Sequence, residues 1–351
     1  MYEFYKGKRV LVTGHTGFKG SWLCKILLEL GAEVYGYALT PPTTPSLFEM
    51  SGMETQVHSE IGDVRDFVHM QRYFEEVRPQ VVFHLAAQPL VRESYKNPVA
   101  TYETNVMGTV HLLECARKSK SVESVLNVTT DKVYENKEWV WGYREDEPLD
   151  GYDPYSNSKS CSELVTHSYI KSFFGELQLP VSTARAGNVI GGGDFAVDRI
   201  VPDCIRAMEK KEPIIVRNPY STRPYQHVLE PLYVYLLIAM KQAEQKEFAG
   251  YYNVGPEECD CVTTGELVTM FCDCYKDGAT WKNISEANPV HEANFLKLDC
   301  SKLKNTFGWK PAFHVKEAIA LTVEFSKKSK TKEMVNDCME RQIALLMERM
   351  K

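Results

Sequence analysis

The sequence has 351 residues and a mass of 40.1 kDa, which fits one large fold or two lobes that share an interface. Apolar residues make up 44% and charged residues 25%, as in ordinary globular proteins, so a wholly disordered chain is excluded. Lys and Arg number 41 against 47 Asp and Glu, a net charge of −6. We therefore expect no nucleic-acid partner, because binding to phosphates needs a basic face.

No apolar stretch is long enough to cross a bilayer; the run at 232–240 is too short and too rich in Tyr. A predicted strand begins near Arg9, which leaves no room for a signal peptide ahead of it. We expect a soluble cytoplasmic protein without a membrane partner.

The ten cysteines include no Cys-x-x-Cys pair. Cys259-x-Cys261 and Cys272-x-Cys274 have one intervening residue, where a four-thiolate zinc site usually has two. In a strand this spacing places both thiols on one face. We interpret all four as free thiols and expect no metal.

Strand and helix patterns alternate through the first half of the chain. We predict strands at 9–13, 33–37, 57–61 (the weakest), 81–85, 124–128 and 181–185, with helices at 20–30, 67–77, 98–119 and 155–174. Gly31 stands where the first helix would end. This alternation predicts an α/β fold, a Rossmann-type doubly wound parallel sheet.

Beyond residue 185 the pattern loosens, with Gly191-Gly192-Gly193 and a proline-rich stretch at 213–231. We expect residues 1–185 to form the sheet domain, with some segments returning from later in the chain. Residues 186–351 would then mainly form a smaller C-terminal lobe that binds substrate. Ligands of open α/β sheets lie at the carboxyl ends of the strands, where such a lobe would close over them.

A glycine-rich motif follows the first predicted strand and opens the first helix. Glycines at this spacing allow a tight turn, close approach of the backbone to a pyrophosphate, and close packing of helix on strand. The helix N-terminus also offers N–H groups to the phosphates. The motif predicts a dinucleotide site at Gly14, Thr16, Gly17, Phe18, Lys19 and Gly20.

The ends of the next strands give weaker signals. No acidic residue ends the second strand to bind the adenine ribose; Thr40 is the nearest polar group, and no Arg is present for a 2′-phosphate. Asp63, followed by Val64, is placed to accept a hydrogen bond from an adenine amino group, or is a helix cap or loop residue. The small residues in Leu85-Ala86-Ala87-Gln88 fit either a cofactor against the backbone or helix–sheet packing.

Tyr155 and Lys159 open the helix predicted at 155–174, and their i, i+4 spacing places them on one face. An ammonium group beside a phenol lowers the pKa of the phenol and makes tyrosinate available as a general base. Such pairs are common by chance, but the dinucleotide turn upstream favours a catalytic role.

Thr130, Asp131 and Lys132 follow the strand predicted at 124–128. A hydroxyl, a carboxylate and an ammonium group in succession at this edge of the sheet suit acid–base chemistry. The alternative is a helix cap followed by a solvated ion pair.

Together these sites resemble the extended short-chain dehydrogenase/reductase family, in its NAD-dependent epimerase/dehydratase group, over nearly the whole chain. In detail the chain looks most like members that dehydrate CDP-glucose. The segments that carry this likeness are residues 13–20, 39–49 (LTPPTTPSLFE), 86–91 (AAQPLV), 104–113 (TNVMGTVHLL), 131–134 (DKVY), 139–144, 152–159, 185–194 (RAGNVIGGGD), 217–231 (RNPYSTRPYQHVLEP) and 291–302.

The resemblance implies a lyase that converts CDP-D-glucose to CDP-4-dehydro-6-deoxy-D-glucose and water, with NAD+ tightly bound and recycled. It implies that Tyr155 takes the proton of the sugar 4-hydroxyl as hydride leaves C4, while Thr130 hydrogen-bonds the same oxygen. Lys159 would lower the pKa of the tyrosine and hold the nicotinamide ribose. Asp131 would protonate the C6 hydroxyl as it leaves. Lys132, a glutamate in dTDP-glucose relatives, would either remove the C5 proton or stabilise the enolate.

The resemblance further implies that Asn188 and Arg223 meet the sugar and diphosphate, and that Arg217, Asn218 and His227 line the nucleotide pocket. Each is alternatively an ordinary contact between the lobes. Family members commonly pair through the two long helices, which predicts a homodimer or tetramer with a four-helix interface. Their product commonly feeds deoxysugar synthesis for cell-surface polysaccharide such as the O-antigen of lipopolysaccharide.

Two other functions compete with this prediction. One is a different nucleotide-sugar 4,6-dehydratase or a 4-epimerase of the same family. Epimerases generally lack an Asp-Glu or Asp-Lys pair after the Thr, because they eliminate no water, so Asp131 and Lys132 favour dehydration. The other is an inactive dinucleotide-binding module, which would typically lack the Tyr or Lys that are present here at 155 and 159.

Overall fold

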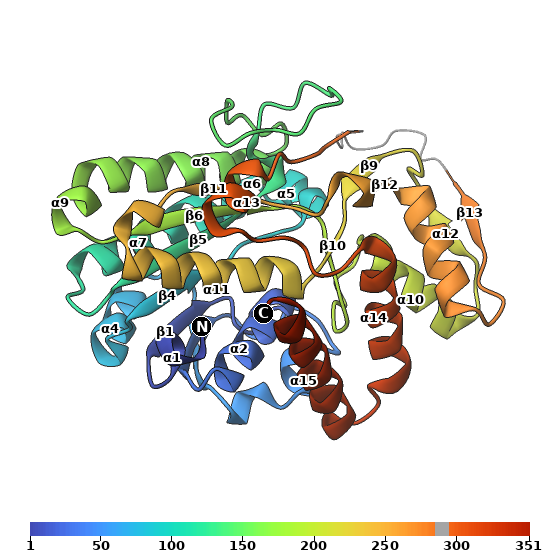
Figure 1. The fold of residues 1–351 in the computed structure, drawn as a ribbon, viewed down its shortest axis with the longest axis horizontal. Helices are drawn as coiled ribbons and strands as arrows, with labels where there is room; N and C mark the ends of the chain where they lie inside the picture. The colour runs from blue at the N-terminus through green and yellow to red at the C-terminus, as the bar shows by residue number, and fades with distance from the viewer. Residues whose placement is uncertain (285–294) are drawn as a thin grey trace.

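The computed structural model describes residues 1–284 and 295–351, so residues 291–294 of the similar segment at 291–302 lie outside the described residues. Seven strands form one parallel sheet in the order β11-β6-β5-β4-β1-β2-β3 (Figure 1). The strands are β1 (Arg9–Thr13), β2 (Glu33–Ala38), β3 (His58–Ile61), β4 (Val81–His84), β5 (Ser124–Thr130), β6 (Val181–Ala186) and β11 (Tyr251–Val254). This strand order confirms the predicted Rossmann-type doubly wound fold.

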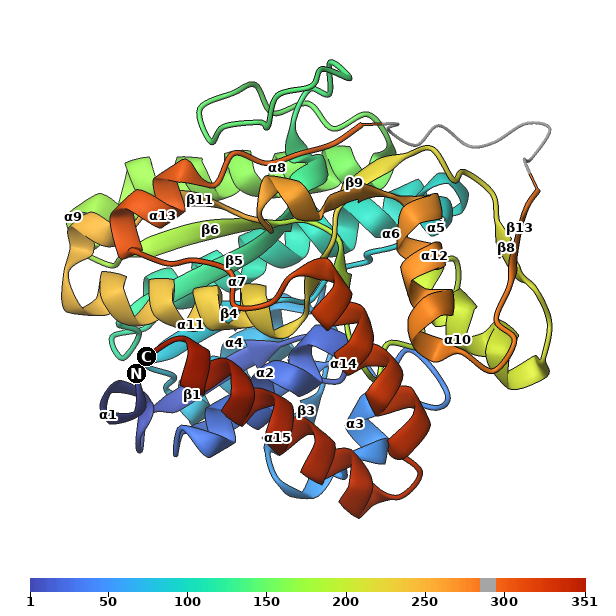
Figure 2. The same cartoon turned by 45° about the vertical axis from the view of Figure 1, so that its right-hand side comes forward.

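Helices cover both faces of the sheet (Figures 1 and 2). Val10 and Val12 of β1 face a core formed with α2 (Phe18–Glu29), α11 (Leu229–Glu244) and α15 (Lys332–Arg349). Leu11 points the other way, into a core with α4 (Phe67–Val77) and α7 (Gly108–Lys118). Side chains alternate along a strand, so one short apolar run supplies both cores.

Each of the two longest predicted helices contains a π-helical turn that divides it into shorter α-helices. The helix expected at 98–119 is α6 (Pro98–Tyr102), a π-helical turn (Glu103–Met107) and α7. The helix expected at 155–174 is α8 (Pro154–Tyr169), a second π-helical turn (Ile170–Phe174) and the short α9 (Gly175–Leu177). A π-helical turn adds one residue to the helical repeat, which apolar spacing alone does not reveal.

The weakest predicted strand is β3, at the edge of the sheet, and its residues are mostly exposed, which explains its weak apolar pattern. The apolar run at 232–240 lies in α11, buried against the sheet, and β11 pairs with β6. Segments that follow residue 185 therefore return to the sheet. No helix of the described residues is long and apolar enough to span a membrane.

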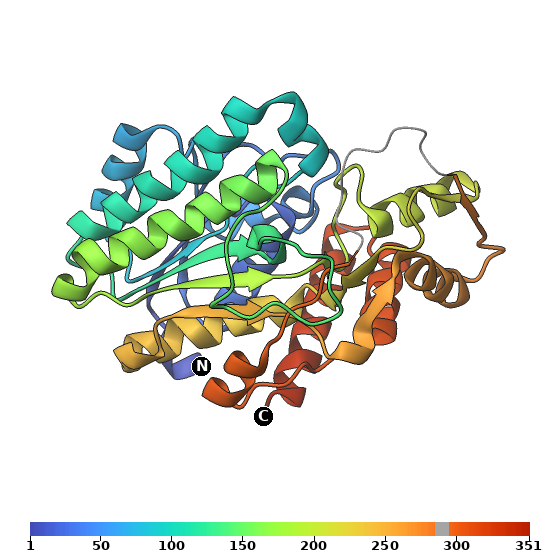
Figure 3. The ribbon, with the colours of Figure 1, turned by 90° about the horizontal axis from the view of Figure 1, so that it is seen from above.

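The later part of the chain forms a second cluster of elements with its own core, which includes Ile214, Leu267 and Ile319. Figure 3 shows these elements beyond the tips of the sheet strands. They are helices α10 (Ile200–Lys210), α12 (Thr264–Tyr275) and α14 (Val315–Lys328) and the strand pairs β7 (Val189–Ile190) with β10 (Gln226–His227), β8 (Ile214–Val216) with β13 (Trp281–Asn283), and β9 (Thr222–Pro224) with β12 (Cys261–Thr263).

The remaining elements are short: α1 (Tyr2–Tyr5), α3 (Leu47–Met50), α5 (Val91–Lys96) and α13 (Ser301–Phe307), together with 3₁₀ turns at Met53–Thr55, Asp131–Val133, Lys246–Phe248 and Glu258–Asp260. All ten cysteines are free. The paired cysteines do not share a strand, because Cys259 lies in a 3₁₀ turn and Cys272 and Cys274 lie on α12. Only Cys261, which opens β12, is in a strand.

Candidate active site

The glycine motif forms the tight turn between β1 and α2 that the sequence predicts. Gly14 has φ +76°, and a Cβ there would lie 2.8 Å from the backbone nitrogen of Ala86. A Cβ on Gly20 would lie 2.1 Å from the Gly14 carbonyl oxygen. Gly17 is the N-cap of α2 and no side chain caps this end of the helix. The uncapped N–H groups fit the phosphates of a dinucleotide.

The residues at the carboxyl ends of β2 and β3 give weaker support for cofactor binding. Thr40 is exposed, and the neighbouring Leu39 carbonyl accepts a hydrogen bond from the Thr16 hydroxyl at 2.9 Å. Asp63 is paired with Arg65 at 2.6 Å, and this hydrogen-bonded partner lowers the pKa of the carboxyl group. The N-cap of α4 is Asp66, so Asp63 is a loop residue.

The segment that follows β4 is held by a network of side chains. The Ala86 N–H donates to the Thr13 hydroxyl at 3.2 Å, and the Gln88 N–H donates to Asn105 at 2.8 Å. Asn105 in turn donates to Ser158 at 2.9 Å, on the helix that carries Tyr155. Leu85 and Ala87 lie in the same segment, and Val64, which follows β3, is buried. The segment thus connects the cofactor turn to α8.

Tyr155 and Thr130 lie together at the carboxyl end of β5, where they line one cavity of about 380 Å³. Burial raises the pKa of Tyr155 to about 12, while a hydrogen bond with Thr130 and the charge of Arg199 act in the opposite direction. The Lys159 ammonium donates to the Val128 carbonyl at 3.0 Å. Burial lowers the pKa of Lys159 to about 8, and Glu163 opposes this shift.

Asp131 is 2% exposed, in the turn that follows β5. One carboxylate oxygen accepts a hydrogen bond from Thr130 at 3.0 Å, and the other has no hydrogen-bond partner among the described residues. Burial raises the pKa of this carboxyl group, although Lys132 and Arg223 lower it. Asp131 can therefore carry a proton at a higher pH than an exposed aspartate does.

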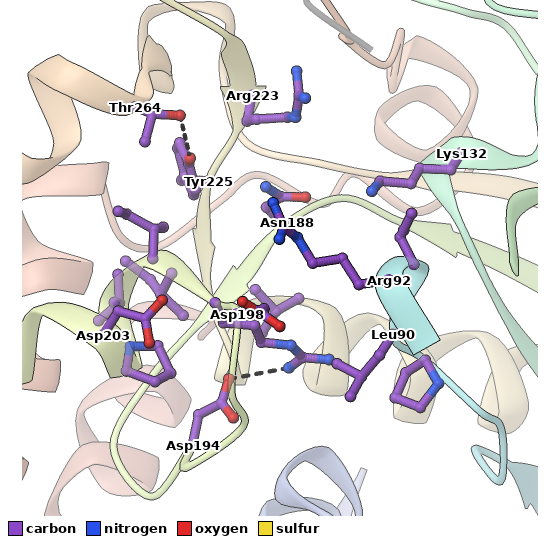
Figure 4. A pocket seen from close by; sticks show the side chains of 18 of the residues that line it. Leu90, Arg92, Lys132, Asn188, Asp194, Asp198, Asp203, Arg223, Tyr225 and Thr264 are labelled. Atoms are coloured by element: carbon purple, nitrogen blue, oxygen red, sulfur yellow. Dashed lines mark hydrogen bonds and ion pairs between the residues drawn. The ribbon is translucent and has the colours of Figure 1, made fainter. Parts of the chain in front are cut away.

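The cavity gathers most of the residues predicted to bind substrate. Asn188, Arg217, Asn218 and Arg223 line it together with the catalytic candidates other than Lys159, and Lys132 points into it from one side (Figure 4). His227 does not line it. That side chain is fully buried between the rings of Trp22 and Phe313, and burial lowers its pKa to about 3.

Other lining residues were not predicted. Arg92 of α5 and Thr264 of α12 face the cavity, and ion pairs join Arg199 to Asp194 at 3.0 Å and Arg217 to Asp198 at 2.9 Å. Arg92 follows the AAQPLV segment directly, so its position in the sequence was a usable signal. Thr264 lies far along the chain from every recognised motif and has no such signal.

Lys19, predicted as part of the cofactor turn, also lines this cavity. Burial lowers the pKa of its ammonium group to about 8, and the charges of Arg199 and Lys159 lower it further, against the opposing effect of Asp131. One side chain of the glycine motif thus reaches the substrate cavity.

One possible set of metal ligands occurs among the described residues, outside this cavity. It consists of Cys259, Asp260 and His314, whose ligand atoms lie within 4.8 Å of one another. His314 and Asp260 are hydrogen-bonded at 2.9 Å, and Asp260 also accepts the Val315 N–H at the start of α14 at 2.9 Å. These contacts make Asp260 a helix-capping residue.

Several known proteins are similar to this chain. The family described as GDP-mannose 4,6 dehydratase matches residues 11–322. The CDP-glucose 4,6-dehydratase of Salmonella typhimurium is 48% identical over 97% of both chains. A probable dTDP-glucose 4,6-dehydratase of Sinorhizobium fredii is 27% identical over 90% of this chain and 92% of its own length.

Solved structures show the same fold. The UDP-glucose 4-epimerase of Thermus thermophilus in complex with NAD superposes with a TM-score of 0.79 at 26% identity, covering 91% of this chain and 99% of its own. The dTDP-glucose 4,6-dehydratase of Bacillus anthracis in complex with NAD gives 0.77 at 20% identity, over 93% and 100% of the two chains. The chain therefore belongs to the GDP-mannose 4,6 dehydratase family, within the extended short-chain dehydrogenases/reductases.

Proposed function

We propose that this chain is a lyase that converts CDP-D-glucose to CDP-4-dehydro-6-deoxy-D-glucose and water with NAD as its cofactor. The observation that carries dehydration is the buried Asp131, which lies beside Thr130 in the cavity of Tyr155 with one carboxylate oxygen unpartnered among the described residues. The extensive identity to the Salmonella CDP-glucose 4,6-dehydratase supports the choice of nucleotide.

The cofactor would lie over the carboxyl ends of the central strands. When bound, NAD+ supplies the acceptor for the hydride from the sugar C4 and the donor of the hydride to C6. The uncapped start of α2 supports phosphate binding there, and so does the tight turn that only glycine allows at Gly14 and Gly20. The residues that would hold it are Gly14, Thr16, Gly17, Phe18, Lys19, Gly20, Thr40, Asp63, Val64, Leu85, Ala86, Ala87, Gln88, Tyr155 and Lys159.

We assign residues 1–185, with the segments that return to the sheet, to the cofactor and residues 186–351 mainly to the sugar nucleotide. Arg223 supports this division, because a guanidinium group pairs well with diphosphate oxygens and its side chain lines the cavity. Asn188, Arg217 and Asn218 would complete the contacts to substrate. His227 would not contact the substrate, since its side chain is fully buried against Trp22 and Phe313.

The first chemical step needs a base at the sugar 4-hydroxyl. Tyr155 would accept that proton while Thr130 hydrogen-bonds the same oxygen. The pKa of Tyr155, about 12 in this structure, must fall for this role. The Lys159 ammonium group donates to the Val128 carbonyl, and its charge would stabilise a tyrosinate.

The second step eliminates water from the 4-keto sugar. The keto group acidifies the C5 proton, and loss of that proton with the C6 hydroxyl forms the enone. Asp131 would donate a proton to the leaving hydroxyl, a role supported by the raised pKa of its carboxyl group. Lys132 lines the same cavity and would either remove the C5 proton or stabilise the enolate.

Mass spectrometry of the products from CDP-, dTDP-, UDP- and GDP-glucose tests this function. We expect the loss of one water from CDP-glucose alone. Loss of water only from another nucleotide sugar would support the dehydration mechanism but refute the proposed specificity for CDP-glucose. An unchanged mass with inverted C4 would identify an epimerase, and no reaction with NAD bound would point to an inactive module.

We further propose that two copies pair through α6–α7 and α8, as a homodimer or as half of a tetramer. Apolar side chains on these helices support this: Val99 is 70%, Met107 45% and Leu164 53% exposed. Sedimentation equilibrium would show a dimer or tetramer, and a wild-type monomer at micromolar concentration would contradict the assembly.

We also propose that the enzyme acts in the cytoplasm and that its product is used in deoxysugar synthesis for O-antigen lipopolysaccharide.

A further inference from the structure

The substrate cavity has two chemically different ends. Lys132 lies at one side of Figure 4 and Asp203 at the opposite side, with Asn188 and Arg223 between them. The glucose must reach Tyr155, which is hydrogen-bonded to Thr130, two residues before Lys132, and its diphosphate would follow toward Arg223. The nucleoside therefore continues toward Asp203.

The Asp203 end combines apolar and charged lining groups. Ile215 of β8, whose side chain is on the exposed face of that strand, and Pro202 of α10 line it with apolar atoms, which suit the faces of a pyrimidine. Beside them, the Arg217 guanidinium lies 3.9 Å from an Asp203 carboxylate oxygen. A hydrogen-bond acceptor, Asp203, and a hydrogen-bond donor, Arg217, are thus adjacent at the end of the cavity.

The interactions of Asp203 leave one of its oxygens able to accept a further hydrogen bond. Arg206, one turn along α10, pairs with the other oxygen of Asp203. Asp198 accepts from Arg217 at 2.9 Å and so orients the guanidinium group. The Asp203 oxygen that faces Arg217 has only a long contact to it, and about one third of the Asp203 side chain is exposed (32%). That oxygen can still accept from another donor.

Cytosine and uracil differ in the atoms that such a pair distinguishes. Cytosine presents an exocyclic amino donor next to a ring nitrogen acceptor, whereas uracil and thymine present a carbonyl acceptor next to an N–H donor. A carboxylate only accepts hydrogen bonds and a guanidinium group only donates them. Acidic side chains accept from the cytosine amino group in nucleic-acid complexes for the same reason.

Resting on the proposed function, we propose that Asp203 and Arg217 determine the nucleotide specificity of this enzyme. Asp203 accepts a hydrogen bond from the cytosine amino group, and Arg217 donates to the ring nitrogen or carbonyl beside it. Asp198 is a positioning residue for Arg217. Uracil or thymine in the same place would set a carbonyl oxygen against the carboxylate, which excludes UDP- and dTDP-glucose.

The test is Asp203→Asn, in which an amide of nearly the same size can donate to a carbonyl. We expect the ratio of kcat/KM for CDP-glucose to that for UDP-glucose to fall about 10- to 100-fold. The kcat at saturating CDP-glucose should stay within a few-fold of wild type, because Asp203 is far from the reacting atoms. The matched control is Glu209→Gln, which removes an exposed carboxylate of the same helix that does not line the cavity and should leave the ratio unchanged.

Calorimetric binding of CDP and UDP to the NAD-loaded protein gives a readout that needs no turnover. Wild type should prefer CDP at least tenfold, and Asp203→Asn should remove most of that preference; Asp203→Ser provides a second variant if the first does not fold. An unchanged ratio in folded Asp203 variants, or the same change in Glu209→Gln, would overturn the role of Asp203. A wild type that dehydrates no CDP-glucose would instead refute the proposed function.

Discussion

The two halves of the active site are built on different principles. On the cofactor side, the turn at residues 14–20 forms the site from backbone, in one continuous segment. On the substrate side, the cavity is lined by side chains from separate segments, from Arg92 on α5 to Thr264 on α12. A backbone site has a local sequence signature, whereas a side-chain site exists only when distant segments meet.

Ion pairs show the same contrast. Glu163 and Arg185, beneath the catalytic residues, are fully buried and paired at 3.0 Å; Glu163 also accepts from Thr129 and Thr183. Burial by itself would raise the pKa of Glu163, but Arg185 and its other donors hold it at about 2. The Asp198–Arg217 pair on the substrate side is 42% and 36% exposed. The buried pair is thus part of the core beside Thr129, whereas the exposed pair lines the cavity.

The largest effect should come from Tyr155→Phe, at the boundary of the two halves. We expect kcat to fall by about 10³-fold, because the variant lacks the base for the sugar hydroxyl, while bound NAD is retained. Turnover and cofactor content of the purified protein would be measured together. Tyr169→Phe on the same helix is the control, and near-normal activity of Tyr155→Phe would refute the assignment.

The contrast between the ion pairs predicts unequal losses of stability. Glu163→Gln leaves Arg185 buried without its charge partner and should lower the free energy of unfolding by about 3–5 kcal/mol. Asp198→Asn should lower it by less than about 1 kcal/mol, since the pair is exposed. Urea unfolding of both variants measures this difference, and equal losses would contradict the comparison.

Asp131→Asn should separate oxidation of the sugar from elimination of water. We expect product formation to fall by about 10²-fold, because the variant has no proton to give to the C6 hydroxyl. C4 oxidation should continue, so NADH should accumulate and be detected by its ultraviolet absorbance. Lys132→Ala should stall at the same stage if Lys132 acts in elimination. Unimpaired product formation in either variant would remove that residue from this step.

The smallest effect concerns Glu230, at the start of α11, which joins the two halves. One of its oxygens accepts the N–H groups of Ala312 and Phe313, both at 2.7 Å, and burial raises its pKa from 4.5 to about 7. The folded protein thus holds this proton more tightly than the unfolded chain does. The resulting stability is fully present below pH 4.5 and is lost as the pH rises to about 7.

Wild type should therefore lose roughly 2 kcal/mol of unfolding free energy across this pH range through Glu230. In Glu230→Gln, position 230 cannot titrate, so this decrease of unfolding free energy with pH should be absent. Chemical unfolding at several pH values measures both slopes. Parallel slopes for the two proteins would show that Glu230 is not the group responsible.

Patterns over a few residues predicted most of the sheet domain. Apolar runs of four to six residues located β1, β4, β5 and β6, because each strand is buried on both faces and shows it in its own composition. The π-helical turns at Glu103–Met107 and Ile170–Phe174 were not predicted, since they depend on how each helix packs.

The sequence by itself determined the cofactor turn and the order of catalytic groups after β5 and at the start of α8. Those features depend on backbone geometry and on spacing within one segment. Only the tertiary structure decided that His227 lies in the core, that Lys19 reaches the substrate cavity, and that Asp203 lies beside Arg217. The physical reason is that burial and electrostatic pairing are set by segments distant in sequence, which no local pattern records.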